Sequence, residues 1–356
     1  MRIVHVLASL GSGGIQGFVF SLAYEQAKKG HEVKVIITDI CDNEHSYKQE
    51  KILNSCGVEV IRLNRHRGNK LELIKTTFQC RRAIGEYKPD IVNSHAGLWG
   101  LYGAISCIGK KYKQVCTIHS TRIEKSAIID FFCKDKPTIC CAKAAFDVYS
   151  GTNNQTVCIE NGVAAEIVRT KYIVDLRSEC KLPSNSKVIV SVGNLRAPKN
   201  YKFLVELAKL AEGTDLHFFI CGASFGSAYD DPTQYEGYPN LHCLGARSDV
   251  SAIENAADLF LSSSLYEGLP IAVLEAYFNG VPCVLSPIKE HKQISDVPKV
   301  WIPQEFEPQE FMKTIKLALE TKESHDEIYE MRKPAIEKFS ISRTADEYLA
   351  FYSRIL

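Results

Sequence analysis

Hydrophobic residues gather along the chain in short runs that alternate with glycine turns and helical patterns. Residues 3–7 form the first run, glycines follow within residues 11–14, and apolar residues at helical spacing continue to Ala27. Gly30 ends this helix, and residues 33–38 supply the next apolar run. Strands that are apolar on both faces and alternate with helices are typical of a parallel sheet that is buried on both sides.

The pattern restarts in the second half, which predicts an α/β protein with two doubly wound Rossmann-like domains. Ligands of such sheets bind at the carboxyl ends of the strands, so we expect the active site in a cleft between the facing domains. We expect an N-terminal domain over residues 1–165, a linker over 166–187, a C-terminal domain over 188–338 and a terminal helix over 339–356. The expected strands of the first half cover residues 3–7, 33–38, 58–63, 90–94, 114–119 and 138–142, and a last strand with its turn covers 156–163. Those of the second half cover residues 188–192, 216–221, 241–244, 259–262 and 282–285.

Composition narrows the class of protein. Hydrophobic residues make up 45% of the 356 residues and charged residues 24%, which is enough apolar surface for two globular domains. The 13 cysteines are odd in number, scattered and without a Cys-x2-Cys pair, so neither a zinc site nor a disulfide framework is indicated and a cytoplasmic location is expected. The uncharged run over residues 93–109 is too short and too polar for a membrane span of ~20 residues. The first residues are expected to form a strand and not a signal peptide.

Charge is unevenly distributed. Residues 1–180 hold 25 Lys and Arg against 18 Asp and Glu, and the remaining residues hold 18 against 24, while the whole chain has a net charge of +1. A total so close to zero does not indicate a nucleic-acid partner. The basic residues of the first half form either a solvated face or a face that approaches an anionic inner-leaflet membrane surface. They are Arg62, Arg65, Arg67, Lys70, Arg81, Arg82, Lys110, Lys111 and Lys113.

A glycine loop over residues 11–17 precedes the first helix. Glycines allow a diphosphate to approach the backbone closely, and the free N–H groups of a helix start favour an anion. Gln16 stands where a dinucleotide fingerprint needs its third glycine, so a tight turn without a ligand is equally open. Asp39, at the end of the next strand, is a candidate ribose-binding acid for a nicotinamide dehydrogenase.

Two glutamates in the second half are more specific. Glu267 and Glu275 stand eight positions apart, the first in a loop and the second about one turn into a helix that opens near Pro270. A carboxylate on such apolar sequence needs a hydrogen-bond donor, for which a sugar hydroxyl is suited. The alternative is a glutamate that the helix dipole stabilises without any ligand.

Together with its surroundings, this pair resembles the Glu-x7-Glu motif of the family-4 glycosyltransferases, which are retaining enzymes of the GT-B fold. The resemblance continues in Gly280 and the strand that follows it, and it extends over nearly the whole chain. Residues 192–200 look like the strand and basic loop of the family, 244–250 like its nucleotide-base loop, and 159–163 like the turn before its linker. In that family the terminal helix crosses back onto the first domain.

The resemblance implies a role for several residues. Arg196 and Lys199 would clamp the donor diphosphate, Glu275 would bind the ribose and Glu267 the transferred sugar. It further implies that Gly268 and the N–H groups of Leu269 and Ile271 face the sugar and phosphate. The loop at Arg247 would hold the base, and His119 would lie near the transferred sugar. Gly13 and Gly14 would let the first domain approach the diphosphate. Two positions depart from the family pattern, because Asn194 stands where an arginine is frequent and Pro270, which lacks an N–H group, replaces a common glycine.

The function implied is a retaining, metal-independent transfer of a hexose or N-acetylhexosamine. The donor would be a nucleotide sugar, with UDP favoured, and the acceptor a hydroxyl of a lipid-linked glycan in bacterial polysaccharide or glycoconjugate synthesis, such as lipopolysaccharide or capsule. The chain contains no Asp-x-Asp motif, so no metal and no cofactor is expected beside the donor substrate. A nucleotide-sugar epimerase of the same fold and a non-catalytic nucleotide-sugar-binding relative remain alternatives, as does the dehydrogenase. The location implied is the cytoplasm or the cytoplasmic face of the membrane.

Overall fold

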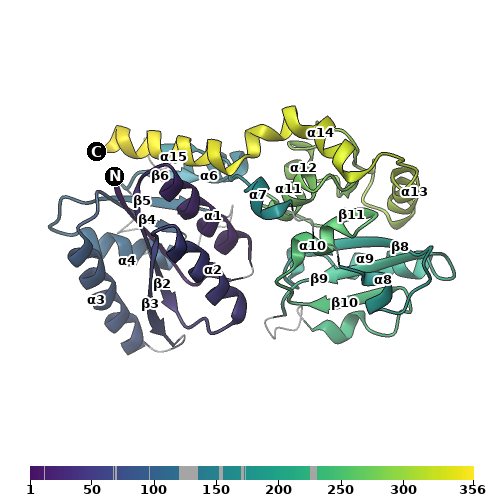
Figure 1. Cartoon of the computed structure of the whole chain (residues 1–356), viewed down its shortest axis with the longest axis horizontal. Coiled ribbons are helices and arrows are strands. Elements are labelled where there is room, and N and C mark those ends of the chain that lie inside the picture. The colour runs from purple at the N-terminus through teal and green to yellow at the C-terminus, as the bar shows by residue number, and fades with distance from the viewer. Residues whose placement is uncertain are drawn as a thin grey trace. The chain divides into compact units, whose positions relative to one another are not determined.

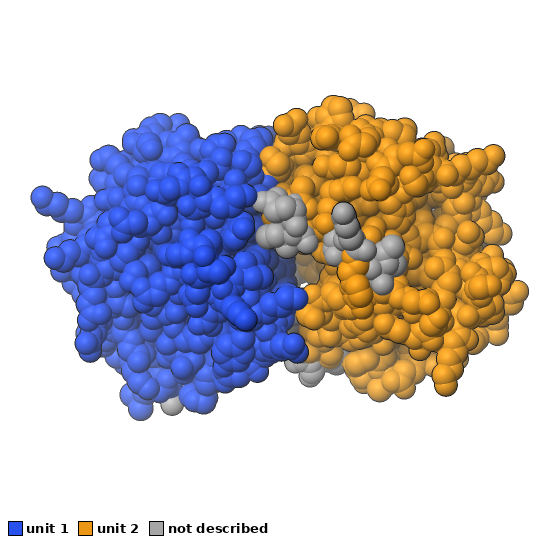
Figure 2. Space-filling view, in the orientation of Figure 1, with its two compact units in different colours: residues 1–162, 341–356 blue, residues 163–340 orange. Residues whose placement is uncertain are grey.

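The structure is a computed structural model of the chain. It describes residues 1–11, 13–66, 68, 70–95, 97–119, 135–151, 155–169, 172, 174–224 and 231–356. The chain divides into two compact units, coloured separately in Figure 2. Unit 1 combines Met1–Gly162 with Ile341–Leu356, and unit 2 is Val163–Ser340.

Unit 1 is built around a parallel sheet of seven strands in the order β3-β2-β1-β4-β5-β6-β7 (Figure 1). The strands are β1 (Arg2–Leu7), β2 (Glu32–Asp39), β3 (Glu59–Arg65), β4 (Ile91–His95), β5 (Lys113–Ile118), β6 (Thr138–Cys140) and β7 (Thr156–Cys158). The helices are α1 (Gly14–Lys28), α2 (Glu44–Ser55), α3 (Lys70–Tyr87), α4 (Gly97–Cys107), α6 (Lys143–Tyr149) and α15 (Ile341–Ile355). The central strands are almost wholly buried, as apolar runs covered by helices on both faces must be.

Helix α15 belongs to unit 1 although it ends the chain. It lies beside α1 (Figure 1) and buries Tyr348 and Tyr352 completely. The Nδ2 atom of Asn93, on β4, donates a hydrogen bond of 2.7 Å to the hydroxyl of Tyr352. Lys29 also forms an ion pair of 2.8 Å with Asp346. The helix is therefore fixed to its sheet by both apolar and polar contacts.

Unit 2 contains a second parallel sheet, of six strands in the order β10-β9-β8-β11-β12-β13. The strands are β8 (Lys187–Val192), β9 (Leu216–Cys221), β10 (Leu241–Gly245), β11 (Leu259–Ser262), β12 (Cys283–Leu285) and β13 (Val300–Trp301). The α-helices are α7 (Ala165–Val168), α8 (Leu176–Glu179), α9 (Lys202–Leu210), α10 (Val250–Asn255), α11 (Ile271–Phe278), α12 (Lys289–Lys292), α13 (Pro308–Ala318) and α14 (His325–Ile336), and the 3₁₀ helices are η1 (Ala197–Lys199), η2 (Pro232–Tyr235) and η3 (Glu337–Phe339).

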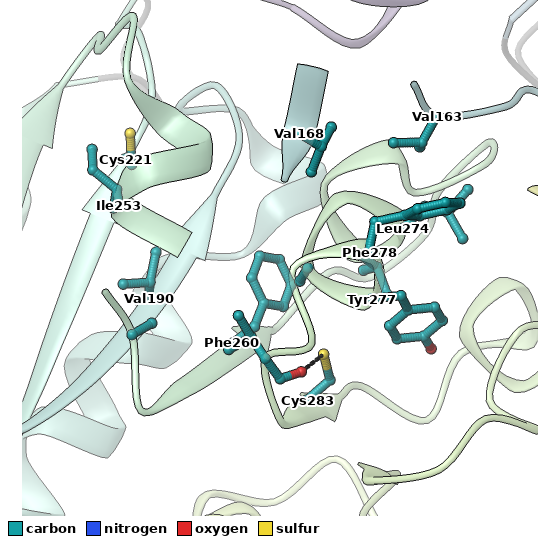
Figure 3. Close-up of a cluster of buried hydrophobic side chains, with 14 of the residues drawn as sticks. Val163, Val168, Val190, Cys221, Ile253, Phe260, Leu274, Tyr277, Phe278 and Cys283 are labelled. Atoms are coloured by element: carbon teal, nitrogen blue, oxygen red, sulfur yellow. Dashed lines mark hydrogen bonds between the residues drawn. The ribbon is translucent and has the colours of Figure 1, made fainter. Parts of the chain in front are cut away.

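Helix α11 is held rigidly by the core of unit 2 (Figure 3). Leu274, Tyr277 and Phe278 are buried there with Phe260 of β11, and each large side chain of this kind contributes roughly 1.5–3 kcal/mol. The hydroxyl of Tyr277 donates to the carbonyl of Ile294 at 3.0 Å. The fully buried guanidinium of Arg332 lies 5.1 Å from the Tyr277 ring centre, and its Nε donates to the carbonyl of Pro298. The orientation of α11 is thus fixed from several sides.

The predicted fold class, two Rossmann-like domains with parallel sheets, is confirmed. Each expected strand is present, but β6 stops two residues before the predicted end, and β7 occupies only the first three residues of the strand and turn predicted over 156–163. The two-residue strand β13 was missed because so short a segment carries no periodicity. Residues 166–187, predicted as a linker, lie within unit 2 and carry α7 and α8.

Two further findings concern the whole of the described chain. No helix in the described residues has the length and apolar character needed to cross a bilayer. Every cysteine in that part of the chain is a free thiol, and half of them are buried, where they act as small apolar side chains.

Candidate functional site

Lys199 lies at the carboxyl end of β8, and Gly193 determines the path of its side chain. Gly193 has φ +150°, and a Cβ atom at this position would come within 2.6 Å of Cε of Lys199. The glycine therefore lets the lysine side chain lie against the backbone. Its ammonium donates a hydrogen bond of 2.7 Å to Oε1 of Glu267. Arg196 belongs to the same turn, since the N–H of Lys199 donates to its carbonyl at 2.9 Å, and its side chain is exposed.

Glu267 is largely buried and ionised. Its Oε1 accepts a second hydrogen bond, of 2.6 Å, from the hydroxyl of Ser264. Burial disfavours the charge, but the ammonium of Lys199 and the two hydrogen bonds outweigh it and lower the pKa of Glu267. The carboxylate is therefore a fixed acceptor whose remaining lone pairs can take hydroxyl donors.

A buried polar cluster supports Glu267 from behind. The hydroxyl of Ser286 donates to the carbonyl of Ser264 at 2.6 Å and lies 3.0 Å from Nδ1 of His291. The hydroxyl of Ser262 bonds the hydroxyl of Ser264 at 3.3 Å. Burial lowers the pKa of His291 to about 4, so this ring is neutral near pH 7. The cluster fixes the Ser264 hydroxyl and so the position of the glutamate.

The N-terminus of α11 follows Glu267 directly. Pro270 is the N-cap residue and makes no side-chain hydrogen bond to the helix. Because the first N–H groups of a helix have no partner within it, those of Ile271 and the next residue are suited to an external acceptor. Leu269 and Gly268 lie in the preceding loop, so they share this end of the helix. The arrangement is suited to binding an anion beside the Lys199 ammonium.

Glu275, which is half-buried, neighbours the fully buried carboxyl group of Glu254. It lies on α11, and Glu254 lies on α10 and is fully buried. Oε2 of Glu254 accepts a 2.9 Å hydrogen bond from Nδ2 of Asn279, whereas its Oε1 has no partner among the described residues. Burial and the neighbouring Glu275 raise the pKa of Glu254 well above its usual range, and burial raises that of Glu275 to about 7 while Lys199 limits the rise. The pair can keep a proton at neutral pH.

Arg247 is tied into unit 2 by two acidic side chains. Its Nε and Nη2 atoms each lie 2.8 Å from an oxygen of Asp249, and Nη1 lies 3.3 Å from Glu179. The guanidinium therefore fixes the loop after β10. The role of this loop at the nucleotide base stays a prediction. Because the guanidinium of Arg247 is already paired with Asp249 and Glu179, the prediction concerns the loop and not the Arg247 cation itself.

In unit 1 the glycine loop leads directly into α1. Gly13 is the N-cap residue with an extended backbone, Gly14 is the first residue of the helix, and no acidic residue stands in the first turn. A side chain at Gly13 would overlap the Gln16 amide. Asp39 is buried and pairs with Arg65, whose Nε lies 2.8 Å from Oδ1. The carboxylate of Asp39 is therefore already paired inside unit 1. The dehydrogenase alternative loses the residue that supported it.

His119 follows β5 and ends a chain of three histidines from neighbouring strands. Its Nε2 lies 3.1 Å from Nδ1 of His95, and Nε2 of His95 lies 2.9 Å from Nδ1 of His5. The chain continues from Nε2 of His5 to Oε1 of Gln26 at 2.8 Å. Burial lowers the pKa of His119 to about 3 and that of His5 to about 4, and burial followed by the two neighbouring rings lowers that of His95. All three rings are neutral near pH 7.

The histidine chain leaves one nitrogen available. Nδ1 of His119 is buried and has no partner among the described residues, and the ring edge packs against Phe18 with ring centres 5.5 Å apart. The family role of His119, near a transferred sugar, stays a prediction. His5 and His95 were not foreseen, because their contact depends on β1, β4 and β5 being adjacent in the sheet.

Several basic residues of the first half are used inside unit 1. Arg62 donates to Glu50 at 2.7 Å, Arg65 pairs with Asp39, and Arg81 donates to the carbonyl of Ile108 at 3.1 Å. Arg67 lies outside the described residues. These partners favour a structural role for Arg62 and Arg65 over a role on a membrane-facing surface.

Unit 2 thus brings Lys199 and Glu267 into contact and places Glu275 on the helix that follows, while Gly13, Gly14 and His119 belong to unit 1. Ser264, His291 and Glu254 were missed, since a lone serine, histidine or glutamate in sequence gives no sign of its burial. Among the described residues, no group of three or more His, Cys, Asp or Glu side chains is placed to hold a metal ion.

Two family models match the chain. Residues 175–333 match "Glycosyl transferases group 1", and residues 12–135 match "Glycosyltransferase Family 4". Each model coincides with most of one structural unit, and together they cover most of the chain.

Similar proteins of known name or structure agree with these matches. The chain is 37% identical over 114 residues to the UDP-Gal:alpha-D-GlcNAc-diphosphoundecaprenol alpha-1,3-galactosyltransferase of Escherichia coli, a match that spans only 30% of either protein. It is 22% identical over 308 residues to the putative glycosyltransferase EpsF of Bacillus subtilis, covering 80% of this chain and 79% of that one. The structure of Anabaena Alr3699/HepE in complex with UDP and glucose superimposes with a TM-score of 0.79 at 17% identity, covering 99% of this chain and all of that one.

Proposed function

Since the chain belongs to the family-4 glycosyltransferases of the GT-B fold, we propose that it transfers a hexose or N-acetylhexosamine from a UDP-sugar to a hydroxyl of a lipid-linked glycan. The observation that carries this proposal is the contact between Lys199 and Glu267 directly before the N-terminus of α11. A cation, helix N–H groups and carboxylates side by side suit a ligand that carries both phosphates and hydroxyls.

The donor would be held by unit 2. Lys199, Arg196 and the first N–H groups of α11 would neutralise the diphosphate, and Glu267 and Glu275 would accept hydrogen bonds from sugar and ribose hydroxyls. Lys199, Arg196 and the helix N–H groups supply the fixed positive charge that a leaving diphosphate requires, so we propose a metal-independent reaction. Arg247 and its loop would lie at the base.

The transfer would keep the anomeric configuration. The bond between the anomeric carbon and the phosphate oxygen breaks, the acceptor oxygen bonds the same carbon from the same face, and the acceptor proton passes to the departing phosphate. Neutral His119 would orient a sugar hydroxyl by a hydrogen bond to Nδ1. The glycines at the start of α1 would leave the N–H groups of that helix start accessible to a phosphate.

The choice of UDP and of a lipid-linked acceptor is supported by relatives. The Escherichia coli relative is named for a UDP-galactose donor and a diphosphoundecaprenol-linked acceptor, and the Anabaena structure holds UDP. We therefore place the protein in polysaccharide or glycoconjugate synthesis, in the cytoplasm or on the cytoplasmic face of the membrane.

A donor screen tests the proposal. The protein is incubated with a panel of UDP-, GDP- and ADP-sugars, with and without a water-soluble analogue of a diphosphate-linked N-acetylhexosamine, and nucleotide release and thermal shift are recorded. We expect acceptor-dependent release of UDP that EDTA leaves unchanged. Conversion of a UDP-sugar without acceptor would favour the epimerase, and a thermal shift without turnover of any acceptor would favour a binding protein.

A further inference from the structure

Helix α3 exposes three large apolar side chains in a row. Leu71, Ile74 and Phe78 have 75%, 56% and 69% of their surface exposed. At positions i, i+3 and i+7 they share one face of the helix. The opposite face carries Cys80 and Ile84, which are buried in the core of unit 1. Single exposed apolar residues are ordinary, but three neighbours on one helix face mark an interaction surface.

The turn after α4 extends this surface. Nη2 of Arg81, on α3, donates to the carbonyl of Ile108 at 3.1 Å and so ties the two segments together. Ile108 itself has 55% of its surface exposed, and Lys110 and Lys111 beside it are exposed as well. Apolar and basic side chains therefore occur together on this part of unit 1.

The charge of these segments is strongly positive. Residues 70–113 contain eight Lys and Arg against three Asp and Glu. Two of the three acids are already paired, Glu72 with Lys75 at 3.3 Å and Glu86 with Arg82 at 2.8 Å. The segment that carries the exposed apolar residues thus has an excess of cations, which is complementary to an anionic surface.

We propose that Leu71, Ile74 and Phe78 of α3, together with Ile108, Lys110 and Lys111, form a docking surface for an anionic lipid bilayer. The apolar side chains enter the boundary between headgroups and acyl chains, and the cations meet the lipid phosphates. A second copy of the chain is a poorer occupant, because a symmetric dimer through this surface would bring two sets of cations face to face. The proposal deepens the proposed function, on which it rests for the biological purpose of docking, by naming the residues that bring the enzyme to a lipid-linked acceptor.

Vesicle binding tests this surface. The full chain is sedimented with vesicles of phosphatidylcholine alone and of phosphatidylcholine with phosphatidylglycerol at 3:1, in low and high salt. We expect binding to the anionic vesicles that salt weakens. The triple variant Leu71→Ser, Ile74→Ser, Phe78→Ser should bind roughly tenfold or more weakly, and Lys110→Gln with Lys111→Gln should reduce binding chiefly at low salt. Leu317→Ser, at an apolar residue of unit 2 with 53% exposure, is the matched control and should bind like the wild type.

Two further measurements separate this inference from the proposed function. Turnover of a water-soluble acceptor and thermal unfolding should be unchanged in the triple variant, since its residues are exposed and far from α11 in sequence. Loss of vesicle binding with turnover intact supports the surface. Equal vesicle binding by the triple variant and the wild type, absence of binding to anionic vesicles, or a wild-type dimer that the triple variant dissolves would overturn it. Absence of transfer with any donor would instead count against the proposed function, because sedimentation does not depend on turnover.

Discussion

Nδ1 of His95 lies 3.1 Å from Nε2 of His119. A neutral imidazole has one N–H and one lone pair, so each ring-to-ring contact needs the N–H of one histidine and the lone pair of the other. With Oε1 of Gln26 facing His5, His5 donates to Gln26, His95 donates to His5, and His119 donates to His95. The lone pair at Nδ1 of His119 is then left to accept a hydrogen bond, so Gln26 sets the tautomer of a ring three contacts away.

Replacing His95, the middle histidine of the three, should break this chain of hydrogen bonds. In His95→Asn, the His119 ring loses its acceptor and its fixed tautomer, so we expect kcat to fall on the order of tenfold or more while KM for the donor changes little. The measurement is steady-state kinetics on folded protein. His217→Asn is the control, because it breaks a contact of 3.1 Å between His217 and His242 in unit 2. Equal losses of kcat in the two variants would contradict a positioning role for His95.

Lys199→Ala should cripple turnover without unfolding unit 2. The lysine supplies the fixed cation for the leaving diphosphate, and removal of one such group costs ~10²–10³ in kcat. Lys209→Ala, which removes a surface ion pair of 3.1 Å with Glu206 on α9, should keep normal activity. The rate of UDP release and the melting temperature are compared for both variants. Near-normal release by Lys199→Ala would refute its role at the diphosphate.

The neighbouring carboxyl groups of Glu254 and Glu275 should make stability depend on pH. Because the folded-state pKa values of Glu254 and Glu275 lie above the unfolded value of 4.5, the unfolded chain loses these protons first as pH rises. Their contribution is fully present below about pH 4.5 and is lost progressively towards pH 7 and above. Glu254→Gln keeps an acceptor for Asn279 and removes one of the two titrations.

We therefore expect Glu254→Gln to be more stable than the wild type at pH 8, on the order of 1 kcal/mol for each unit by which the pKa is raised. Near pH 4 the difference should vanish. Urea unfolding at the two pH values measures it, with Glu212→Gln as an exposed control. A variant less stable than the wild type at pH 8 would mean that Glu254 is ionised and stabilised by a cation.

Patterns local in sequence predicted the strands and part of the site. A strand covered on both faces is apolar throughout, so β8 and β9 were recognisable from their own residues. Glu267 and Glu275 were found by their spacing on one loop and helix. The contact between Glu267 and Lys199 was harder to predict, because the two residues are 68 positions apart in sequence.

Features that depend on the tertiary structure were not predictable in this way. His5, His95 and His119 meet only because β1, β4 and β5 are neighbours in the sheet. Leu71, Ile74 and Phe78 have the spacing of a buried helix face, so their sequence suggests core and not surface. Burial, which raises the pKa of Glu254, likewise follows from packing around α11 and not from its neighbours in sequence.

The hydroxyl of Tyr352 offers a test of how α15 stabilises unit 1. Tyr352→Phe keeps the buried ring but leaves Nδ2 of Asn93 without its acceptor, and an unpaired buried donor costs about 1–3 kcal/mol. Urea unfolding followed by a probe in unit 1 should report this loss. Tyr47→Phe is the matched control, since the hydroxyl of Tyr47 bonds Asp42 at the surface and its removal should cost less than ~0.5 kcal/mol. If both variants unfold at the same urea concentration as the wild type, the bond between β4 and α15 contributes nothing, and the apolar packing of Tyr348 and Tyr352 alone fixes the terminal helix.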